Sequence, residues 1–462
     1  MEKPKFRMPT AYTILFLLII LVALSTWLIP AGSYEYAGDV PVAGTYHTVE
    51  PSPQGIGAVL KAAFSGFYDA VDVCVFILMV GGFLGVVMKT GAVDAGVGNI
   101  IRLLNHKEKW LIPILMLLFG LGGTTYGMWE ETMAFYPLLI PVFLAAGYDA
   151  VVGISVILLG AGAGIISSTV NPFATGIAAG FAGVSLGEGI LLRVIQWVVF
   201  EGAAIWFVMA YAAKVKKNPA RSVVGVGAGK IQANMEEAVE FTPRRKLIMA
   251  LFTLTFLVMI YGVIPFDEMG LPLPVLGWWF PELSALFLVG GVVIGLIDRQ
   301  REDEIAETYV AGCADLLGVA LIIGISRGIT VLMNDGKITD TVLHWGEEAL
   351  SGAGPVSFVL LVYLIYLPLT ILIPSSSGLA TLSVPIMAPL GRFAGVGGDL
   401  VVTAFQSASG LVNIITPTAA VVMGALALGH VPYDRWLKYV WKLILYFFLL
   451  NMVFLVVGVL IG

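Results

Sequence analysis

The stretch Gly-Leu-Gly-Gly-Thr-Thr-Tyr-Gly-Met-Trp-Glu-Glu, residues 120–131, decides how this chain folds. It is polar and rich in glycine, yet apolar runs flank it on both sides. A Pro-x-x-x-Pro motif follows at 137–141, and a second polar break, Ser-Ser-Thr-Val-Asn-Pro, follows at 167–172. Glycine and proline interrupt regular helices, so the pattern predicts apolar helices separated by unwound polar backbone.

The same design occurs again later in the chain. Ile-Pro-Ser-Ser-Ser-Gly at 373–378 is followed by Pro-x-x-x-Pro at 385–389 and by Asn-Ile-Ile-Thr-Pro-Thr at 413–418. Matching positions outside these motifs include two more pairs, Met88 with Met333 and Asp149 with Asp399. Their offsets are 333 − 88 = 245 and 399 − 149 = 250. Because the offset stays nearly constant, the sequence predicts two structural repeats.

The composition places most of the chain in a membrane. Of its 462 residues, 58% are hydrophobic and 12% are charged, and the mean hydropathy is +0.94. Soluble domains carry about 25% charged residues. Apolar runs at 11–30, 246–265 and 436–460 reach the roughly 20 residues that cross a bilayer. The sequence holds no Walker A motif, no catalytic triad and no metal-ligand cluster, so it predicts neither an enzyme nor an ATP-driven pump.

Basic residues set the topology. Residues 1–10 and the loop 214–246 are rich in Lys and Arg, whereas the loops 31–54 and 266–283 contain neither. Since cytoplasmic loops carry the excess of Lys and Arg, the N-terminus should be cytoplasmic in a multi-pass protein of the inner (plasma) membrane. The distribution predicts an all-α protein with nine transmembrane helices and two re-entrant hairpins.

The predicted organisation has five parts. They are 1–73, an N-terminal helix with an interfacial segment; 74–213, a first repeat with a hairpin at 110–147; 214–246, a cytoplasmic loop; 247–312, linker and scaffold helices; and 313–462, a second repeat with a hairpin at 355–395. Five spans separate the starts of the two repeats. Because the number of spans is odd, the second repeat has the opposite orientation in the membrane to the first. The two hairpins should therefore enter the membrane from opposite faces, as alternating access requires.

Three motifs carry a resemblance to a known family. Gly-Gly-Thr-Thr-Tyr-Gly-Met-Trp-Glu-Glu (122–131), Met-Asn-Asp-Gly-Lys-Ile-Thr-Asp (333–340) and Pro-Ser-Ser-Ser-Gly-Leu-Ala (374–380) resemble the YfcC/DcuC-type carriers of the ion transporter superfamily. The resemblance implies a scaffold domain, a mobile domain that holds both hairpins, an elevator-type movement and a homodimer. One branch of the family is associated with C4-dicarboxylates, and the YfcC branch with exchange of basic amino acids.

The four polar breaks should converge on one site, where unwound backbone and helix N-termini can bind ions. The candidate substrate-binding residues carry hydroxyl, amide, aromatic or charged side chains. They are Thr124, Thr125, Tyr126, Trp129, Glu130, Glu131, Ser168, Thr169, Asn171, Arg327, Ser375, Ser376, Ser377, Asn413, Thr416 and Thr418. The hydroxyl groups could instead make helix–helix hydrogen bonds.

The resemblance also implies a coupling ion. In the superfamily, Ser/Asn/Thr motifs hold sodium and the substrate carboxylate, which suggests Na⁺ near Ser168, Asn171, Ser376 and Asn413. Neither break is a complete Ser-Asn-Thr motif. The alternative coupling ion is H⁺, held by one carboxyl group of the pair Glu130 and Glu131. No other cofactor is expected. The expected partners are a small-molecule substrate, the lipid bilayer and a second copy of the chain, but no nucleic acid.

Glu130 and Glu131 are the most informative residues, because an ionisable side chain at bilayer depth usually has a function. With an offset of 248, which aligns the Pro-x-x-x-Pro motifs, they lie opposite Gly378 and Leu379 and so break the repeat. Such an asymmetric charge favours a substrate with a cationic side chain. The pair could also lie at the membrane interface, make an ion pair with Arg327, or hold a coupling proton.

We therefore expect a secondary active transporter that exchanges basic amino acids, such as arginine and ornithine, by alternating access. The alternative is a sodium- or proton-coupled carrier of C4-dicarboxylates or other organic anions. The acidic pair Glu130 and Glu131 distinguishes these two hypotheses, since two ionised carboxylates would repel a dicarboxylate. An anion carrier would have to rely on Arg327.

Overall fold

The computed structural model describes residues 11–37, 40–42, 44–93, 95–96, 108–125, 127–185, 187–225, 240–263, 272–278, 280–350 and 352–461. These residues form seventeen α-helices and only four two-residue strands, which confirms the mostly helical fold. The predicted site residue Tyr126 lies outside the described residues, as do large parts of the loop 214–246.

The α-helices follow one another in this order: α1 Ala11–Ser25, α2 Ile56–Asp69, α3 Val71–Lys89, α5 Leu111–Thr125, α6 Tyr136–Ala145, α7 Ala150–Ile166, α8 Ile177–Ala182, α9 Ile190–Lys217, α10 Pro243–Val263, α11 Phe280–Ile297, α12 Glu302–Asp335, α13 Thr339–Leu350, α14 Pro355–Leu372, α15 Ser376–Phe393, α16 Gly398–Asn413, α17 Ala420–Leu428 and α18 Tyr433–Ile461. The short helices are η1 Glu108–Trp110, η2 Glu130–Phe135, η3 Pro172–Gly176 and η4 Pro219–Arg221. The strands β1 Gly32–Ser33 and β4 His47–Thr48 pair antiparallel, as do β2 Tyr36–Ala37 and β3 Val40–Pro41.

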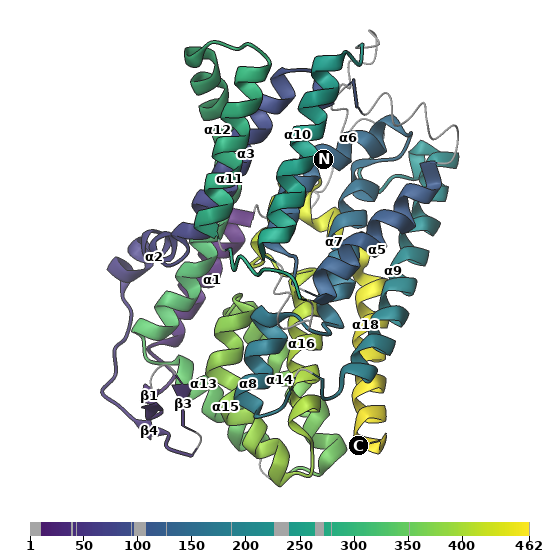
Figure 1. The fold of residues 1–462 in the computed structure, drawn as a ribbon. Coiled ribbons are helices and arrows are strands. Elements are labelled where there is room, and N and C mark those ends of the chain that lie inside the picture. Colours follow the sequence, from purple (N-terminus) through teal and green to yellow (C-terminus); the bar gives the residue numbers. More distant parts are fainter. Residues whose placement is uncertain are drawn as a thin grey trace, which may run out of the picture.

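One group of helices packs around α12 (Figure 1). Small residues let its helices approach closely: a Cβ atom added to Gly81 of α3 would lie 2.5 Å from the carbonyl oxygen of Gly312 in α12. On the next turns of α12, a Cβ on Gly66 of α2 would overlap the backbone of Gly324 and Gly328. Such backbone contact between membrane helices is typical of small-residue interfaces. It holds α2 and α3 firmly against α12.

The second group is built around the two interrupted helices, α7 and α16. All residues of α7 are buried, and so are all but one of α16. A helix that is apolar on every side belongs in a core, which fits α7. The helix α16 is just as buried, although it carries polar side chains such as Thr403, Gln406 and Ser407. Their ends meet, because a Cβ on Gly410 of α16 would lie 2.7 Å from the Cα atom of Ile166 in α7. The two breaks therefore face each other inside the molecule.

The order of elements is the same in both halves. After α3 come the pair α5–α6, the interrupted helix α7–α8 and the long helix α9; after α12 and α13 come the pair α14–α15, the interrupted helix α16–α17 and the long helix α18. The two helical pairs lie where the sequence predicts hairpins. In Figure 1, α6 lies toward the top of the molecule and α15 toward the bottom.

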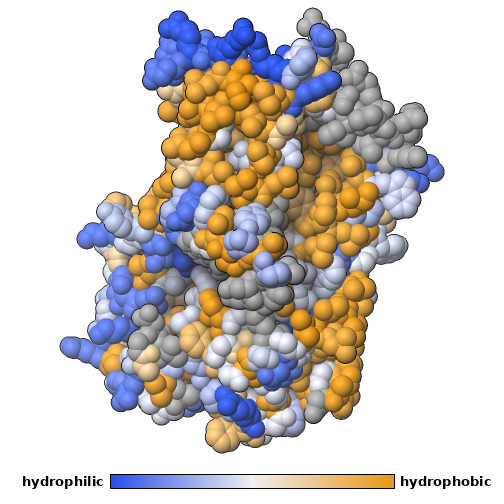
Figure 2. Space-filling model, in the orientation of Figure 1, coloured by the Kyte–Doolittle hydropathy of each residue, from blue (hydrophilic) through white to orange (hydrophobic). Residues whose placement is uncertain are grey.

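Six of the described helices are long and apolar enough to cross a membrane: α3, α9, α11, α12, α14 and α18. Residues 12–25 of α1 and all of α7 form shorter apolar helices. Figure 2 shows broad apolar surface over the flanks and a hydrophilic cap where α11 joins α12. This distribution supports a multi-pass membrane protein, whereas the total of nine spans stays a prediction.

Three local features go beyond the sequence-based expectations. The boundary drawn between the parts 247–312 and 313–462 falls inside the continuous 34-residue helix α12. The segment after it folds into the helix α13, which was not predicted from the sequence. The lysine-free loop after α1 forms the strand pairs, where Asp340 of α13 accepts hydrogen bonds from the Tyr34 N–H at 3.0 Å and the Tyr36 hydroxyl at 2.8 Å.

Candidate functional site: a polar cavity between the two helical pairs

The tip of the first helical pair depends on a glycine. The helix α5 ends at Thr125, and the chain turns through Gly127, whose φ is +79°. A Cβ atom there would lie 2.5 Å from the side chain of Asn171 in the first break. Only glycine combines this left-handed backbone with such a close approach. The turn leads into η2, which begins with Glu130 and Glu131.

The tip of the second pair is a helix N-terminus. The helix α14 ends at Leu372, and Ser375 caps α15 by accepting a hydrogen bond from the Gly378 N–H at 3.2 Å. The hydroxyl groups of Ser375 and Ser377 are 3.4 Å apart. A helix start exposes unpaired N–H groups and the positive end of the helix dipole. This tip can therefore attract an anionic group.

Both tips and both breaks line one cavity of about 240 Å³. Ten of the predicted site residues lie on its wall: Trp129, Glu130, Glu131, Asn171, Arg327, Ser375, Ser376, Ser377, Asn413 and Thr418. The N-terminus of α17, at Ala419 to Val421, also faces it. The structure thus brings together residues from both halves of the chain, as the repeat pattern predicts.

Acidic side chains dominate the cavity wall. Asp69, Asp72, Glu130 and Glu131 line it, and Arg327 is the single basic residue among its described lining residues. The Arg327 Nε atom is 3.0 Å from the Asp69 Oδ2 atom. The one guanidinium is thus already paired with a carboxylate of α2, and not with either hairpin carboxylate.

The hairpin carboxylates themselves have few partners. One Glu131 oxygen accepts a hydrogen bond from the Trp129 N–H at 3.1 Å, and the Glu131 side chain is 9% exposed. No described residue makes an ion pair with Glu130 or Glu131. The tip therefore presents two carboxyl groups to the cavity without an ion-pair partner among the described residues, although the charge of Arg327 acts on Glu130 from a distance.

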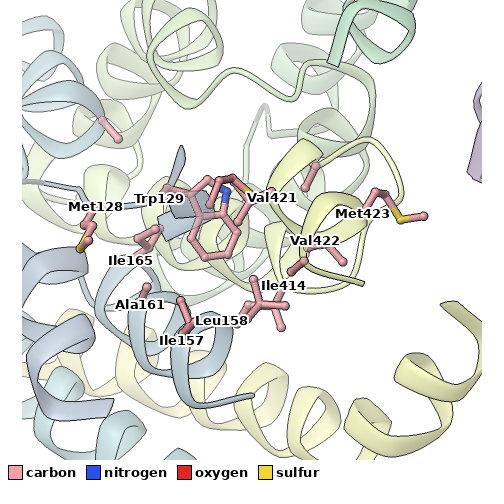
Figure 3. Close-up of a cluster of buried hydrophobic side chains, with 14 of the residues drawn as sticks. Met128, Trp129, Ile157, Leu158, Ala161, Ile165, Ile414, Val421, Val422 and Met423 are labelled. Atoms are coloured by element: carbon pink, nitrogen blue, oxygen red, sulfur yellow. The ribbon is translucent and has the colours of Figure 1, made fainter. Parts of the chain in front are cut away.

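An apolar cluster fixes this tip in place. Figure 3 shows the indole of Trp129 between side chains of α7, such as Ile165, and side chains of the second break and α17, such as Ile414 and Val421. Trp129 is 8% exposed, although it also reaches the cavity wall. Burying an aromatic ring of this size contributes several kcal/mol, on the order of 3–5 by the cost of deleting one. The cluster thereby positions the two glutamates that follow.

The other predicted residues lie behind the wall. The Thr124 hydroxyl donates to the Ser167 carbonyl at 2.8 Å, and the Thr169 hydroxyl donates to the Thr124 carbonyl at 2.9 Å, which joins the first tip to the first break. The Thr125 hydroxyl donates to its own helix, Ser168 accepts from Thr175, and Thr416 bonds to Thr418. The contacts of Thr124 and Thr169 match the helix-linking alternative for hydroxyl groups in membrane proteins, whereas the other three hydrogen bonds stay within one stretch of chain.

Four polar residues of the wall were not predicted from the sequence: Asp69, Asp72, Ser326 and Gln406. Gln406 is 1% exposed, and its amide nitrogen donates to the Ile165 carbonyl at 2.8 Å. Its Oε1 atom and the Oδ1 atom of Asn413 have no hydrogen-bond partner among the described residues. A glutamine in the middle of a membrane helix was the available signal, since polar groups at that depth need partners.

Comparisons with known proteins agree on a family of transporters. Residues 8–460 match the family model DcuC, described as C4-dicarboxylate anaerobic carrier. An uncharacterized protein of Haemophilus influenzae is 34% identical over 99% of this chain and 98% of its own. The Escherichia coli protein named "Putative basic amino acid antiporter YfcC" is 31% identical over 94% of this chain and 93% of its own.

Two solved structures match at lower similarity. The YdaH transporter of Alcanivorax borkumensis is 14% identical with a TM-score of 0.47, covering 96% of this chain and 98% of that one. Neisseria gonorrhoeae MtrF, from a class of antimetabolite efflux pumps, is 17% identical with a TM-score of 0.46, covering 97% and 95%. The family match over nearly the whole chain confirms the resemblance noted from the motifs. This chain belongs to the DcuC family and is a multi-pass secondary transporter of the membrane.

Proposed function

We propose that this transporter exchanges basic amino acids, of the arginine and ornithine type, across the inner membrane. The observation that carries the proposal is the charge of the cavity wall, where four carboxyl groups face one guanidinium. Clefts lined by one sign of charge concentrate solutes of the opposite sign. A substrate with a cationic side chain fits such a wall, and a dicarboxylate does not.

The cationic end of the substrate would bind at the first tip. A guanidinium can bind a carboxylate through two parallel hydrogen bonds, and an ammonium can bind it as a point charge. Glu130 and Glu131 have no ion-pair partner among the described residues, so both are available for this contact. Glu131 is 9% exposed, so water screens a contact there less than it would in solution.

The α-carboxylate would bind at the opposite tip. Ser375, Ser376 and Ser377 offer hydroxyl groups and backbone N–H groups at the start of α15, and α17 also begins at the cavity wall. Helix N-termini of interrupted helices bind carboxylates in other secondary transporters. A basic amino acid carries both charges, so it could bridge the two tips. This arrangement supports an amino acid over a simple polyamine.

Exchange follows from the same charge. Four acidic residues and one basic residue leave a formal excess of 4 − 1 = 3 negative charges in the empty cavity. Reorienting an uncompensated charged site within a membrane is costly, so the loaded carrier should reorient more readily than the empty one. The relative from Escherichia coli is named as an antiporter of basic amino acids, which is in line with exchange.

Alternating access would use the two halves as inverted repeats. The shared order of elements and the positions of α6 and α15 toward opposite ends support this assignment. The group around α7 and α16 would be the mobile domain of an elevator, and the group around α12 the scaffold. A homodimer through α1, α10 and α11, with the N-terminus in the cytoplasm, completes the proposal.

The family description keeps one alternative open, a carrier of C4-dicarboxylates coupled to Na⁺ or H⁺. It would need Arg327 to leave Asp69 and bind a substrate carboxylate. The unpartnered oxygens of Gln406 and Asn413 would be candidate sodium ligands, since sodium prefers uncharged and carboxylate oxygens. The excess of acidic residues argues against this substrate class.

Counterflow in proteoliposomes tests the proposal. Vesicles loaded with ornithine should accumulate labelled arginine, and Glu130→Gln and Glu131→Gln should each lower the rate at least tenfold, because each removes a charge-assisted hydrogen bond of about 1.5–3 kcal/mol. Glu302→Gln, at the exposed start of α12, is the matched control and should change nothing. Accumulation of labelled succinate under a sodium or proton gradient, without arginine exchange, would overturn the proposal.

A further inference from the structure

A second cavity, of about 360 Å³, lies at the lysine-rich end of α9. Its wall includes Lys109 before α5 and Lys216 and Lys217 in the last turn of α9. Apolar groups such as Ile112 and Met209 form its floor. No acidic residue is among its described lining residues, which sets it apart from the cavity between the helical pairs.

In the described part of the chain, one carboxylate is paired with one of these three ammonium groups. Lys216 is 3.2 Å from the Glu108 carboxylate, and its Nζ atom lies 5.0 Å from the ring centre of Tyr148. Lys109 and Lys217 make no ion pair within the described part of the chain. Among the described residues, three lysines against one glutamate leave a formal excess of two positive charges at this cavity. A cavity lined by charges of one sign favours the binding of the opposite charge.

Apolar surface leads away from this basic cavity along α5. Trp110, Ile114, Leu118 and Leu121 repeat at helical spacing, and between 44% and 58% of each side chain is exposed. Residues spaced by three or four positions lie on one face of a helix. Trp206 of the neighbouring helix α9 is 73% exposed. The result is an outward apolar stripe that begins with a tryptophan, a residue typical of the membrane–water interface.

We propose that this basic cavity binds the phosphate headgroup of an anionic phospholipid, whose acyl chains lie along the stripe on α5. The lysines supply the charge at headgroup depth, and the stripe supplies the apolar surface below it. Basic pockets between membrane helices bind anionic headgroups in this way. The inference is independent of the transported substrate, because the lipid cavity and the transport cavity share no residue.

Native mass spectrometry of the purified full chain in detergent tests this site. We would titrate phosphatidylglycerol, with phosphatidylcholine of the same acyl chains as the neutral comparison, and count bound lipids. The wild type should retain at least one phosphatidylglycerol preferentially. The double variant Lys109→Gln/Lys217→Gln should weaken its binding roughly 25-fold, because each basic residue near a headgroup contributes about a factor of five.

The matched control is Lys442→Gln in α18. Lys442 is an exposed lysine beside a tryptophan, with its Nζ atom 5.7 Å from the Trp441 ring, but it lies outside this cavity. Equal loss of lipid in the control and the double variant, or no loss in the double variant, would overturn the proposal.

A parallel titration with inorganic phosphate distinguishes a lipid headgroup from free phosphate as the bound group. If free phosphate displaced the bound lipid at millimolar concentration, the site would be one for a soluble anion. Melting curves without added lipid confirm that each variant is folded.

Discussion

Replacing Arg327 with glutamine should make this carrier bind arginine more tightly, whereas Asp69→Asn should make it bind arginine more weakly. In the structure the two side chains neutralise each other across a distance of 3.0 Å. Without Arg327, the carboxylate of Asp69 is free to attract a cationic substrate. Without Asp69, the guanidinium loses its ion-pair partner in the same cavity, and its charge then acts against that substrate. The double variant should bind arginine nearly as the wild type does.

The expected size of these changes in arginine affinity depends on how far Arg327 and Asp69 are exposed to solvent. Of the two side chains, 27% of Arg327 and 47% of Asp69 is exposed, so solvent screens their charges. For two unit charges about 8 Å apart at an effective dielectric constant of about 40, Coulomb's law gives about 1 kcal/mol. That energy corresponds to roughly a fivefold change in affinity. One single variant should bind arginine about fivefold more tightly than the wild type and the other about fivefold more weakly. If the two shifts are additive, the affinities of the two variants for arginine should differ by about 25-fold.

The assay is inhibition of labelled arginine counterflow by unlabelled arginine in proteoliposomes, with citrulline as a neutral analogue of similar shape. Inhibition by citrulline should respond to neither variant, since its side chain carries no charge. If Arg327→Gln instead weakens the binding of arginine more than tenfold, Arg327 binds the substrate carboxylate and the reasoning fails. Equal weakening by both single variants would point to structural damage rather than to charge.

Further substitutions test how the first tip is held. Gly127→Ala should abolish exchange and lower the melting temperature, whereas Gly147→Ala, at a similar φ of +83° but with open space around it, should cost only the backbone strain of about 1 kcal/mol. Trp129→Ala should destabilise the protein by about 3–5 kcal/mol, read as a large fall in melting temperature, and an unchanged melting curve would contradict the role of the apolar cluster. Gly120→Ala should also destabilise the protein, because its Cβ would overlap the Glu201 carboxyl group, and Glu201→Ala should restore part of the loss if that overlap is the cause.

Local signals in the sequence were enough to locate the helical pairs and the breaks. Glycine, proline and runs of small polar residues stop a helix wherever they occur, so the tips lie close to their predicted positions. The acidic pair Glu130 and Glu131 could be assigned to the site because a carboxylate within an apolar stretch is costly and usually has a function. The placement of such residues could therefore be predicted from their own stretch of sequence, whereas the role of the acidic pair stays a prediction.

Residues whose role depends on a distant partner could not be predicted in this way. Asp69 ends an amphipathic helix, and its local pattern predicts an interfacial position, yet it pairs with Arg327 from the other half of the chain. Thr124 and Thr169 have the chemistry of ligands, but their hydroxyl groups satisfy nearby carbonyl groups instead. Hydrogen bonds to unwound backbone depend on the three-dimensional path of both segments, which no single stretch of sequence specifies.

The length of α12 has a practical consequence for studying this protein. A helix of 34 residues is about 51 Å long, whereas the hydrocarbon core of a bilayer is about 30 Å thick. Even a tilted α12 must extend beyond the lipid, and the hydrophilic cap at its junction with α11 marks that end. A rigid fusion partner inserted in the turn between Asp298 and Arg301 would be carried by two packed helices. It would stand clear of both helical pairs, and so could serve as an alignment marker for electron cryomicroscopy during transport.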